Sequence, residues 1–329
     1  MSQDTYTCIE QLDLATRQLE EGSPSYGRFA LILIDNVVEL IIHKVCAHEI
    51  SYDDMWIKLG KPRFTPAQRS DATGQRFDKK VKFCKKLKKI TAGQAEAIQI
   101  CHKYRNELYH TGLKYNDIVW DLAWYYHEIA TELLAEVYPD HSWSSGAEVT
   151  AAVEKHAGKG GQKVLSEMNE VAESLRQSIP KRDRALPEAL SSSAQSRVEE
   201  TEDSLEFLAK DDPQSRTEAV TIYELQFYDY IRSEEPLIKE IWEKVKTVKQ
   251  RKAAMEFVRE IWEPKYKRNP LPNFVTQARK ISGQKSELNA LKAFERFKSQ
   301  FAYFSGIVEE AAIALEMYIQ QQIDAMRGK

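Results

Sequence analysis

Apolar side chains recur every three or four residues along most of this chain, which is the spacing of one face of an α-helix. Residues 6–21 follow this pattern, and Gly22 after them is typical of a helix end. Residues 25–49 are apolar on most sides, and Ser23 and Pro24 suit the start of a helix. These segments predict a one-sided outer helix followed by the central helix of a bundle.

Three further helices are predicted in the first half of the chain. Residues 50–75 contain several glycines and prolines and predict an irregular connection. Residues 75–89 and 91–110 return to helical spacing, and Gly112 suits the end of the second of these helices. The last helix covers residues 116–139. No segment here alternates apolar and polar residues for long, so the pattern predicts an all-helical bundle.

The pattern changes after residue 140. Residues 141–218 are small, polar or charged, apart from a heptad-like apolar spacing over residues 164–179. Residues 219–329 are helical again, and their many aromatic side chains are expected in a core. We expect an all-α protein with three parts: a bundle over residues 1–140, a polar linker with marginal helices over 141–218, and a C-terminal helical domain with a regulatory or dimerisation role.

Composition narrows the class of protein. The chain has 329 residues, a net charge of −3 and four scattered cysteines, which indicate neither a disulfide framework nor a zinc site. The longest apolar run, residues 29–45, is shorter than the roughly 20 residues of a membrane span, and the first residues do not resemble a signal peptide. We therefore expect a cytoplasmic protein without membrane contact, in which any nucleic-acid site is a local patch.

The sequence CHKYRNELYHTGLKY, residues 101–115, combines an arginine, an amide and a histidine near the end of a predicted helix. At 100° per residue, Arg105, Asn106 and His110 fall within an arc of about 140°, and Asn106 and His110 are neighbours four residues apart. The helix dipole favours a charged histidine in the last turn. A histidine can transfer a proton and an arginine can hold charge that builds on phosphate, so the three residues suit phosphodiester chemistry.

A simpler interpretation stays open for each of these polar residues. Arginine, asparagine and histidine also occur near helix ends as solvated or capping residues. Asp35, Asn36 and Glu39 interrupt the central apolar helix, and buried polar groups need partners. We expect ordinary bonds within or between helices for them, with a contact to Arg105 or to a symmetry-related copy of the chain as the alternative.

The remaining histidines are spread along the chain and do not form a metal-ligand pattern. His102 and His127 are interpreted as helix-face residues rather than ligands. The sequence therefore predicts a site without metal and without a cofactor.

A second feature is a basic helix over residues 76–89, with eight basic side chains, one acidic side chain and a net charge of +7. Such a cluster attracts phosphate backbones without reading their sequence. The alternative is a solvated amphipathic helix, and Phe77, Val81 and Cys84 are expected to contact the core rather than bases. The candidate RNA-binding residues are Arg76, Lys79, Lys80, Lys82, Lys85, Lys86, Lys88 and Lys89.

The motif RNELYH at residues 105–110 resembles the R-x(4–6)-H signature of HEPN superfamily ribonucleases, including the polar residue after the arginine. The acidic-centred helix ALILIDNVVELIIH, residues 30–43, is also similar to the second helix of these proteins. The resemblance covers roughly residues 5–140. It implies a metal-independent endoribonuclease that acts as a homodimer with a composite site, in which the ribose 2′-OH attacks the adjacent phosphate and leaves a 2′,3′-cyclic phosphate.

Carried onto this chain, the resemblance makes Arg105 the stabiliser of the transition state. His110 is the general acid or base, or holds the scissile phosphate, and Asn106 orients one of the two residues. Asp35, Asn36 and Tyr109 are expected as supporting residues. The resemblance further implies a toxin or antiphage-defence setting and an antitoxin or sensor partner. The alternative is a non-catalytic HEPN module that binds RNA, a nucleotide or a partner protein.

One position departs from a branch of this family. In toxins that are paired with a nucleotidyltransferase antitoxin, a tyrosine stands two residues after the motif histidine, whereas this chain has Gly112. Control by modification of that tyrosine is therefore not expected.

Overall fold

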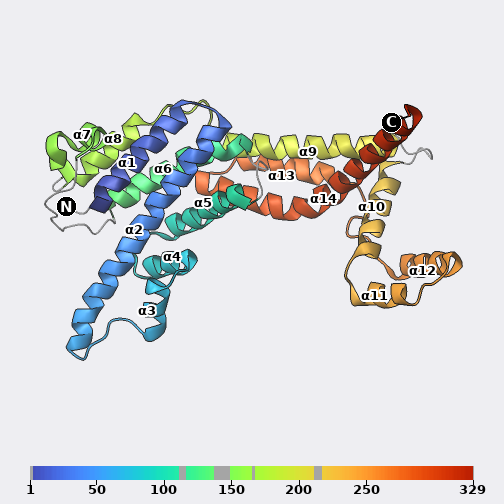
Figure 1. Cartoon of the computed structure of the whole chain (residues 1–329), viewed down its shortest axis with the longest axis horizontal. Helices are drawn as coiled ribbons and strands as arrows, with labels where there is room; N and C mark the ends of the chain where they lie inside the picture. The colour runs from blue at the N-terminus through green and yellow to red at the C-terminus, as the bar shows by residue number, and fades with distance from the viewer. Residues whose placement is uncertain (1–2, 111–115, 137–148, 165–166, 211–216, 329) are drawn as a thin grey trace. The chain divides into compact units, whose positions relative to one another are not determined.

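The computed structural model describes residues 3–110, 116–136, 149–164, 167–210 and 217–328. The chain divides into two compact units, residues 1–189 and 190–329 (Figure 1). The described residues form α-helices and one short 3-10 helix and contain no strand. The predicted all-α class is therefore confirmed.

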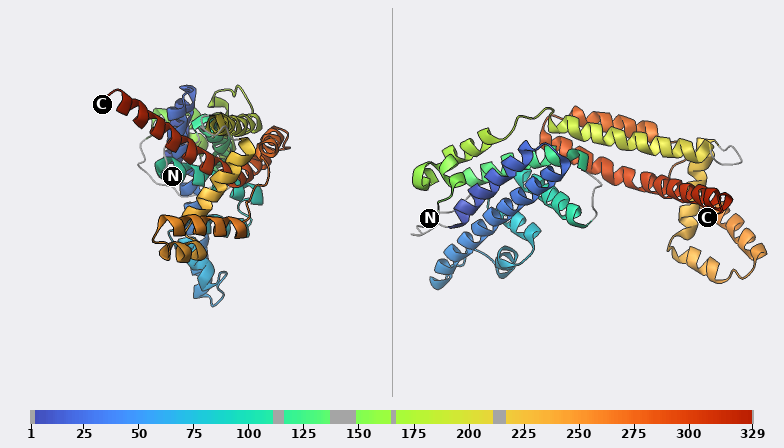
Figure 2. Two further views of the ribbon diagram at one scale, coloured as in Figure 1. Left: turned by 90° about the vertical axis from the view of Figure 1, so that its right-hand side faces the viewer. Right: turned by 45° about the horizontal axis from the view of Figure 1, so that its top comes forward.

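The first unit is built around one long helix, α2. The helices α1, α4, α5 and α6 contact α2. Figures 1 and 2 show α1 and α6 running alongside it. The apolar residues Leu31, Ile34, Val38 and Ile41 in the middle of α2 are fully buried, as expected for a central helix, whereas Phe29 near its start and Met55 near its end are exposed. The elements of this unit are α1 (Gln3–Glu20), α2 (Pro24–Lys58), α3 (Pro66–Thr73), α4 (Phe77–Lys86), α5 (Ala92–His110), α6 (Asn116–Glu136), α7 (Ala151–Ala157), η1 (Lys159–Val164) and α8 (Met168–Ser178).

A glycine brings α2 and α6 close together. A Cβ atom at Gly27 would lie 3.1 Å from the backbone of Trp120 in α6, so a larger residue would push the two helices apart. The indole Nε1–H of Trp120 also donates to the carbonyl of Leu19 at 2.9 Å, which ties α6 to the end of α1. This close contact fixes how α2 lies against the two helices beside it.

The end of α2 differs from the prediction. Residues 50–75 were expected to be irregular, but α2 continues to Lys58 and α3 occupies Pro66–Thr73. Asp53 in this extension is fully buried, where it accepts a 2.6 Å hydrogen bond from the backbone N–H of Arg63 and pairs with the Arg69 side chain. The expectation was wrong because these glycines and prolines mark helix ends: Gly60 follows the end of α2, and Pro66 is the first residue of α3.

The region expected to be a linker also differs. The described part of residues 149–178 forms α7, η1 and α8, which belong to the first unit and pack on α1 and α6. Val171 and Leu175 of α8 are fully buried there, and the Trp124 indole of α6 donates to the carbonyl of Pro180 at 2.8 Å. These short helices have few apolar residues. Burial of those residues against the bundle stabilises the helices.

The second unit is also helical, and a buried aromatic cluster lies on one face of its longest helix. Phe274 of α13 contacts Phe301 of α14 with ring centroids 4.9 Å apart, and the α9 hydroxyl of Ser191 donates to the Ala278 carbonyl at 2.9 Å. Figures 1 and 2 show α9, α13 and α14 running side by side. The elements are α9 (Leu186–Lys210), α10 (Glu218–Arg232), α11 (Pro236–Glu243), α12 (Val248–Ile261), α13 (Leu271–Ser282) and α14 (Glu287–Met326).

A smaller core within the second unit joins α10, α11 and α12. Phe227, Ile238 and Val258 form its buried centre, and Trp242 and Trp262 pack against it. The tryptophans are therefore core residues, as the sequence predicted.

His127 in α6 predicts a strong acid sensitivity of the first unit. The ring is fully buried with Nε2 3.3 Å from the Thr16 hydroxyl oxygen, and burial lowers the pKa of His127 to about 3. The unfolded chain binds a proton near pH 6.5 and the folded one does not, so stability is complete above pH 6.5 and is lost as the pH falls towards 3. We expect a loss of about 2–3 kcal/mol near pH 4.5.

The measurement is urea unfolding between pH 7 and pH 4, compared with His127→Gln. The variant loses packing but cannot be protonated, so its stability should fall less over this range. Equal pH dependence of the two proteins would contradict the assignment to His127.

Candidate functional site

Arg105 lies in α5 and faces two carboxylates of α2. The start of α5 is fixed by a capping box, in which the Thr91 hydroxyl accepts from the Gln94 backbone at 3.1 Å and the Gln94 side chain accepts from the Thr91 backbone at 2.9 Å. Asp35 and Glu39 are four residues apart on α2 and therefore lie on one face of that helix. The packing of α5 on α2 brings this acidic face against the side of α5 that carries Arg105.

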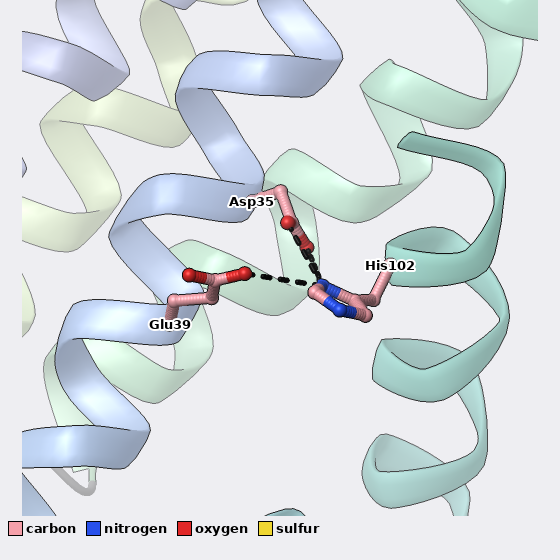
Figure 3. A group of neighbouring side chains, drawn as sticks. All are labelled: Asp35, Glu39 and His102. Atoms are coloured by element: carbon pink, nitrogen blue, oxygen red, sulfur yellow. Dashed lines mark hydrogen bonds and ion pairs between the residues drawn. The ribbon is translucent and has the colours of Figure 1, made fainter. Parts of the chain in front are cut away.

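Asp35 is the centre of the resulting polar cluster. Its carboxylate is fully buried and accepts hydrogen bonds from three side chains. The donors are Arg105 Nε at 2.6 Å, His102 Nδ1 at 3.0 Å and the Tyr126 hydroxyl of α6 at 2.9 Å. Figure 3 shows the Asp35 and Glu39 side chains approaching His102 from α2. A buried carboxylate with this many donors is fully compensated.

The guanidinium of Arg105 is held on three sides. Besides its bond to Asp35, Nη2 pairs with the Glu39 carboxylate and Nη1 donates to the Asn106 side-chain oxygen at 2.9 Å. The Arg105 side chain is 18% exposed and that of Glu39 is 36% exposed. Carboxylates and an amide therefore fix the plane of the guanidinium, and a part of the side chain reaches the surface.

The two carboxylates have opposite pKa shifts. Burial raises the pKa of Asp35, but hydrogen bonds and charge from His102 and Arg105 outweigh it, so the pKa of Asp35 lies below its ordinary value. Burial and the charge of Asp35 raise the pKa of Glu39 despite Arg105. Burial and the same charge hold the pKa of Tyr126 well above its ordinary value. Asp35 is thus the permanent anion, and Tyr126 remains a hydrogen-bond donor.

His102 is the last member of the cluster, and its protonation decides whether the cluster can bind a metal ion. Asp35, Glu39 and His102 each offer a ligand atom within 4.8 Å of the others, which the sequence analysis did not predict. The Nδ1 atom faces carboxylate oxygens, at 3.0 Å for Asp35 and 3.3 Å for Glu39, and therefore carries a proton. The guanidinium of Arg105 already pairs with both carboxylates. A metal would have to displace the proton and the guanidinium, so this arrangement fits a hydrogen-bonded cluster and not a metal site.

The structure brings some of the predicted site residues together. Arg105, Asn106 and Asp35 are joined by hydrogen bonds. Asp35 makes the expected bonds between helices, to His102 and Tyr126. The contact of Asp35 and Glu39 with Arg105, which the sequence analysis gave as the alternative, forms as well. Asn36 is exposed on another face of α2 and takes no part in the cluster, because one residue along a helix is a rotation of 100°.

Two predicted residues belong to the last turn of α5. Tyr109 and His110 are within the helix, but the placement of their side chains, like Gly112 after them, lies outside the described residues. The backbone before them is held by Arg28 of α2, whose Nη2 donates to the carbonyl of Leu108 at 3.1 Å. This bond fixes the turn that carries the motif histidine against the central helix.

Sequence reasoning missed His102 and Tyr126 as members of the cluster. His102 precedes Arg105 by three residues, so the two share a helix face, and this spacing was the available signal. Tyr126 had none, because only the packing of α6 against α2 brings its hydroxyl to Asp35. The ring of His102 also lies 4.5 Å from that of Phe77 in α4, so the cluster connects the motif helix to the basic helix.

The basic helix is confirmed as an amphipathic helix, α4. Val81 and Cys84 are fully buried, as predicted, and the lysines are on the remaining faces. Several of its charges have partners: Arg76 and Lys82 with Asp78, Lys79 with Asp71, Lys89 with Glu49, and Lys80 with His43. Lys85, Lys86 and Lys88 are exposed and have no such partner among the described residues. Among the described residues, the positive charge without a partner is therefore concentrated at the C-terminal end of this helix.

Lys88 has an unusual backbone at this end. Its φ is +59°, in the left-handed region that residues other than glycine rarely adopt. The Lys89 N–H donates to the Cys84 carbonyl and the Lys88 N–H to the Lys85 carbonyl, both at 3.0 Å, which is the Schellman pattern that normally ends on glycine. The fold thus places a lysine where glycine is favoured, and its side chain stays exposed.

Lys88→Gly should stabilise the protein by about 1 kcal/mol, because glycine removes the cost of the left-handed backbone. Urea unfolding measures this change. Lys86→Gly is the matched control, since it removes the same charge from inside the helix and should cost about 1 kcal/mol. Destabilisation by both substitutions would contradict the assigned backbone conformation.

Comparison with protein-family models, with curated proteins and with solved structures finds no match to this chain. Among the described residues, no helix has the length and apolar character needed to cross a lipid bilayer. The geometry of the cluster and the motif that contributes to it therefore carry the functional assignment.

Proposed function

We propose that the protein is a metal-independent endoribonuclease of the HEPN type, which acts as a homodimer with a composite site. The observation that carries the proposal is the fixed guanidinium of Arg105, bonded to Asp35, Glu39 and Asn106 on the helix that ends at His110. A guanidinium whose position is set before substrate binds can stabilise charge without reorganising during the reaction.

In the proposed reaction the ribose 2′-OH attacks the adjacent phosphorus. A P–O2′ bond forms, the P–O5′ bond breaks, and the products carry a 2′,3′-cyclic phosphate and a 5′-hydroxyl. One proton leaves the 2′-OH and one is delivered to O5′. Histidine is suited to these transfers near neutral pH, so His110 is assigned to one of them. Arg105 stabilises the charge on the nonbridging oxygens, and Asn106 orients Arg105.

RNA cleavage in the presence of EDTA tests this proposal. A fluorescent single-stranded RNA should be cut without added metal, and the 5′ fragments should carry 2′,3′-cyclic phosphate ends that resist phosphatase until they are opened by acid. The same oligonucleotide with 2′-O-methyl groups should remain intact, because it has no attacking hydroxyl. Cleavage of the methylated oligonucleotide, or activity that disappears in EDTA, would contradict the mechanism.

A second candidate is a non-catalytic module that binds RNA, a nucleotide or a partner protein. The contacts of Arg105 with Asp35 and Glu39 also support this candidate. A guanidinium that is bound by two carboxylates and only 18% exposed can stabilise the fold as an ion pair without taking part in a reaction. This candidate is supported if the protein binds RNA tightly and leaves it uncut. A role in toxin or antiphage defence, with an antitoxin or sensor partner, rests on the resemblance to HEPN proteins.

The exposed end of α4 is proposed to hold the RNA backbone. Replacing Lys85 and Lys86 by glutamate should weaken binding of the 2′-O-methyl RNA, and the slope of log affinity against log salt should fall by about 1.4, or about 0.7 for each lost phosphate contact. Fluorescence anisotropy at several salt concentrations measures both quantities. The double substitution Lys280→Glu/Lys285→Glu, at two exposed positions of the second unit, changes the net charge by the same amount and is the control. An unchanged salt slope in the α4 variant would exclude this surface.

A further inference from the structure

A second cluster of basic side chains lies in the second unit, where α11 leads into α12. Five of the nine residues 244–252 are basic, and residues 244–255 include no acidic side chain. Residues 190–329 together carry 22 basic and 23 acidic side chains, so this concentration stands against a nearly neutral background. We name residues 244–252 the basic turn; its charged members are Lys244, Lys246, Lys249, Arg251 and Lys252.

The charges of the basic turn are mostly not neutralised by neighbours. All five side chains are exposed, and only Lys244 forms an ion pair with a described residue, with Glu240 at 2.6 Å. The basic helix differs, because four of its eight cations form ion pairs with described residues. Four exposed cations in a short segment create a local positive potential that attracts anions.

The backbone that carries these charges is held in place. Thr247 caps α12, with its hydroxyl accepting from the Gln250 N–H at 3.2 Å, and the Gln250 side chain accepts from the backbone of Lys246 at 2.9 Å and of Thr247 at 3.1 Å. Val258 of the same helix is buried in the core with Phe227. Lys249 and Lys252 are neighbours three residues apart on the first turn, so the cations form a fixed group.

The arrangement favours a polyanion in water over a membrane surface. At 100° per residue, Lys252 and Ile261 lie on opposite sides of α12, and Phe257 lies about 140° from Lys252. Phe257 is 50% exposed and Ile261 is 45% exposed. A helix that lies in a membrane surface inserts one apolar face with basic residues along its edges. Here Val248, which is 87% exposed within the basic turn, lies about 180° from Phe257, so the exposed apolar residues of α12 do not form one face.

We propose that the basic turn binds the phosphodiester backbone of a nucleic acid without reading its bases. Single-stranded RNA is the ligand favoured by the assignment of the first unit, but the inference does not depend on cleavage. Each lysine or arginine that contacts a phosphate releases counterions, so binding is strongest at low salt.

The experiment uses the full chain and a 2′-O-methyl RNA, which the proposed nuclease cannot cut. Lys249→Glu/Lys252→Glu should weaken binding about tenfold at low salt, and the salt slope should fall by about 1.4. The matched control is Lys280→Glu/Lys285→Glu, which changes the net charge equally at two exposed positions of the same unit. It should leave the slope unchanged. Circular dichroism and thermal unfolding confirm that both variants fold.

The outcomes separate this inference from the proposed nuclease. Equal losses in the two double variants, or no loss in either, would overturn the role of the basic turn. Loss of binding to vesicles with anionic lipids, with RNA binding intact, would also overturn it. If RNA binding depends on Lys249 and Lys252 while unmodified RNA is never cut, the basic turn stands and the nuclease assignment fails.

Discussion

Arg105→Ala is expected to reduce RNA cleavage by about 10²–10³-fold, because removing one preorganised donor from a developing negative charge has an effect of this size. The loss should be in the rate of the chemical step more than in RNA binding, since other basic surfaces hold the backbone. Single-turnover cleavage of a short RNA, with anisotropy for binding, separates the two quantities.

Arg105→Lys is the informative companion of this variant. It keeps a positive charge beside Asp35, so the fold should be retained, but an ammonium cannot make the fixed planar contacts of a guanidinium. We expect cleavage by Arg105→Lys to stay at least tenfold below that of the wild type. Lys103→Ala, at an exposed position of the same helix, should leave cleavage unchanged. Full activity of Arg105→Ala would exclude Arg105 from the reaction.

Asp35→Asn is expected to destabilise the first unit by about 3–5 kcal/mol, the cost of removing one partner from a buried ion pair. Asp35 is fully buried and accepts from Arg105, His102 and Tyr126, and an amide of the same shape cannot satisfy three donors as an anion does. Because native proteins are stable by only about 5–15 kcal/mol, this loss is large. Urea unfolding at pH 7 measures it.

The pH dependence of this loss tests its electrostatic origin. The pKa of Asp35 is lowered in the folded state, so its stabilisation is present above the ordinary value near 3.8 and is lost as the pH falls through the lowered pKa. The difference between wild type and Asp35→Asn should therefore be greatest near neutrality and should shrink in strong acid. A difference that does not change with pH would point to lost packing instead.

Glu39→Gln is the matched control for Asp35→Asn. The Glu39 side chain is 36% exposed and its pKa is raised, so its charged form is less favoured in the folded state than that of Asp35. Neutralising it should cost far less than neutralising Asp35. Equal destabilisation by the two substitutions would contradict the central role of Asp35 in the cluster.

Much of the fold could be predicted from helical spacing. The helix predicted over residues 91–110 is α5. The basic helix predicted over residues 75–89 is α4, which begins two residues later and ends three residues earlier. The long C-terminal helix begins after Ser286, whose hydroxyl accepts from the Asn289 N–H at 3.2 Å as a capping residue does. Such helices can be predicted from sequence because apolar periodicity and capping depend only on neighbouring residues.

The sequence interpretation was least accurate where the hydrogen-bond partners of polar residues lie outside their own helix. The continuation of α2 to Lys58 depends on Arg63 and Arg69 reaching Asp53. The helices α7 and α8 depend on the bundle on which they pack, as the 2.9 Å bond from His156 Nε2 to Asp13 illustrates. Neither partner can be recognised from the spacing of residues within one segment.

The sequence by itself determined that the chain is all-helical, that Arg105, Asn106 and His110 belong to one helix, and that lysines cover the helix before it. These properties follow from the 3.6-residue period of the helix, which acts over neighbouring residues. Only the tertiary structure decided what Arg105 contacts. Asp35 lies 70 residues before it and Tyr126 lies 21 after it. Their meeting depends on three helices burying their apolar faces together, and a polar group buried between them is costly unless it is hydrogen-bonded.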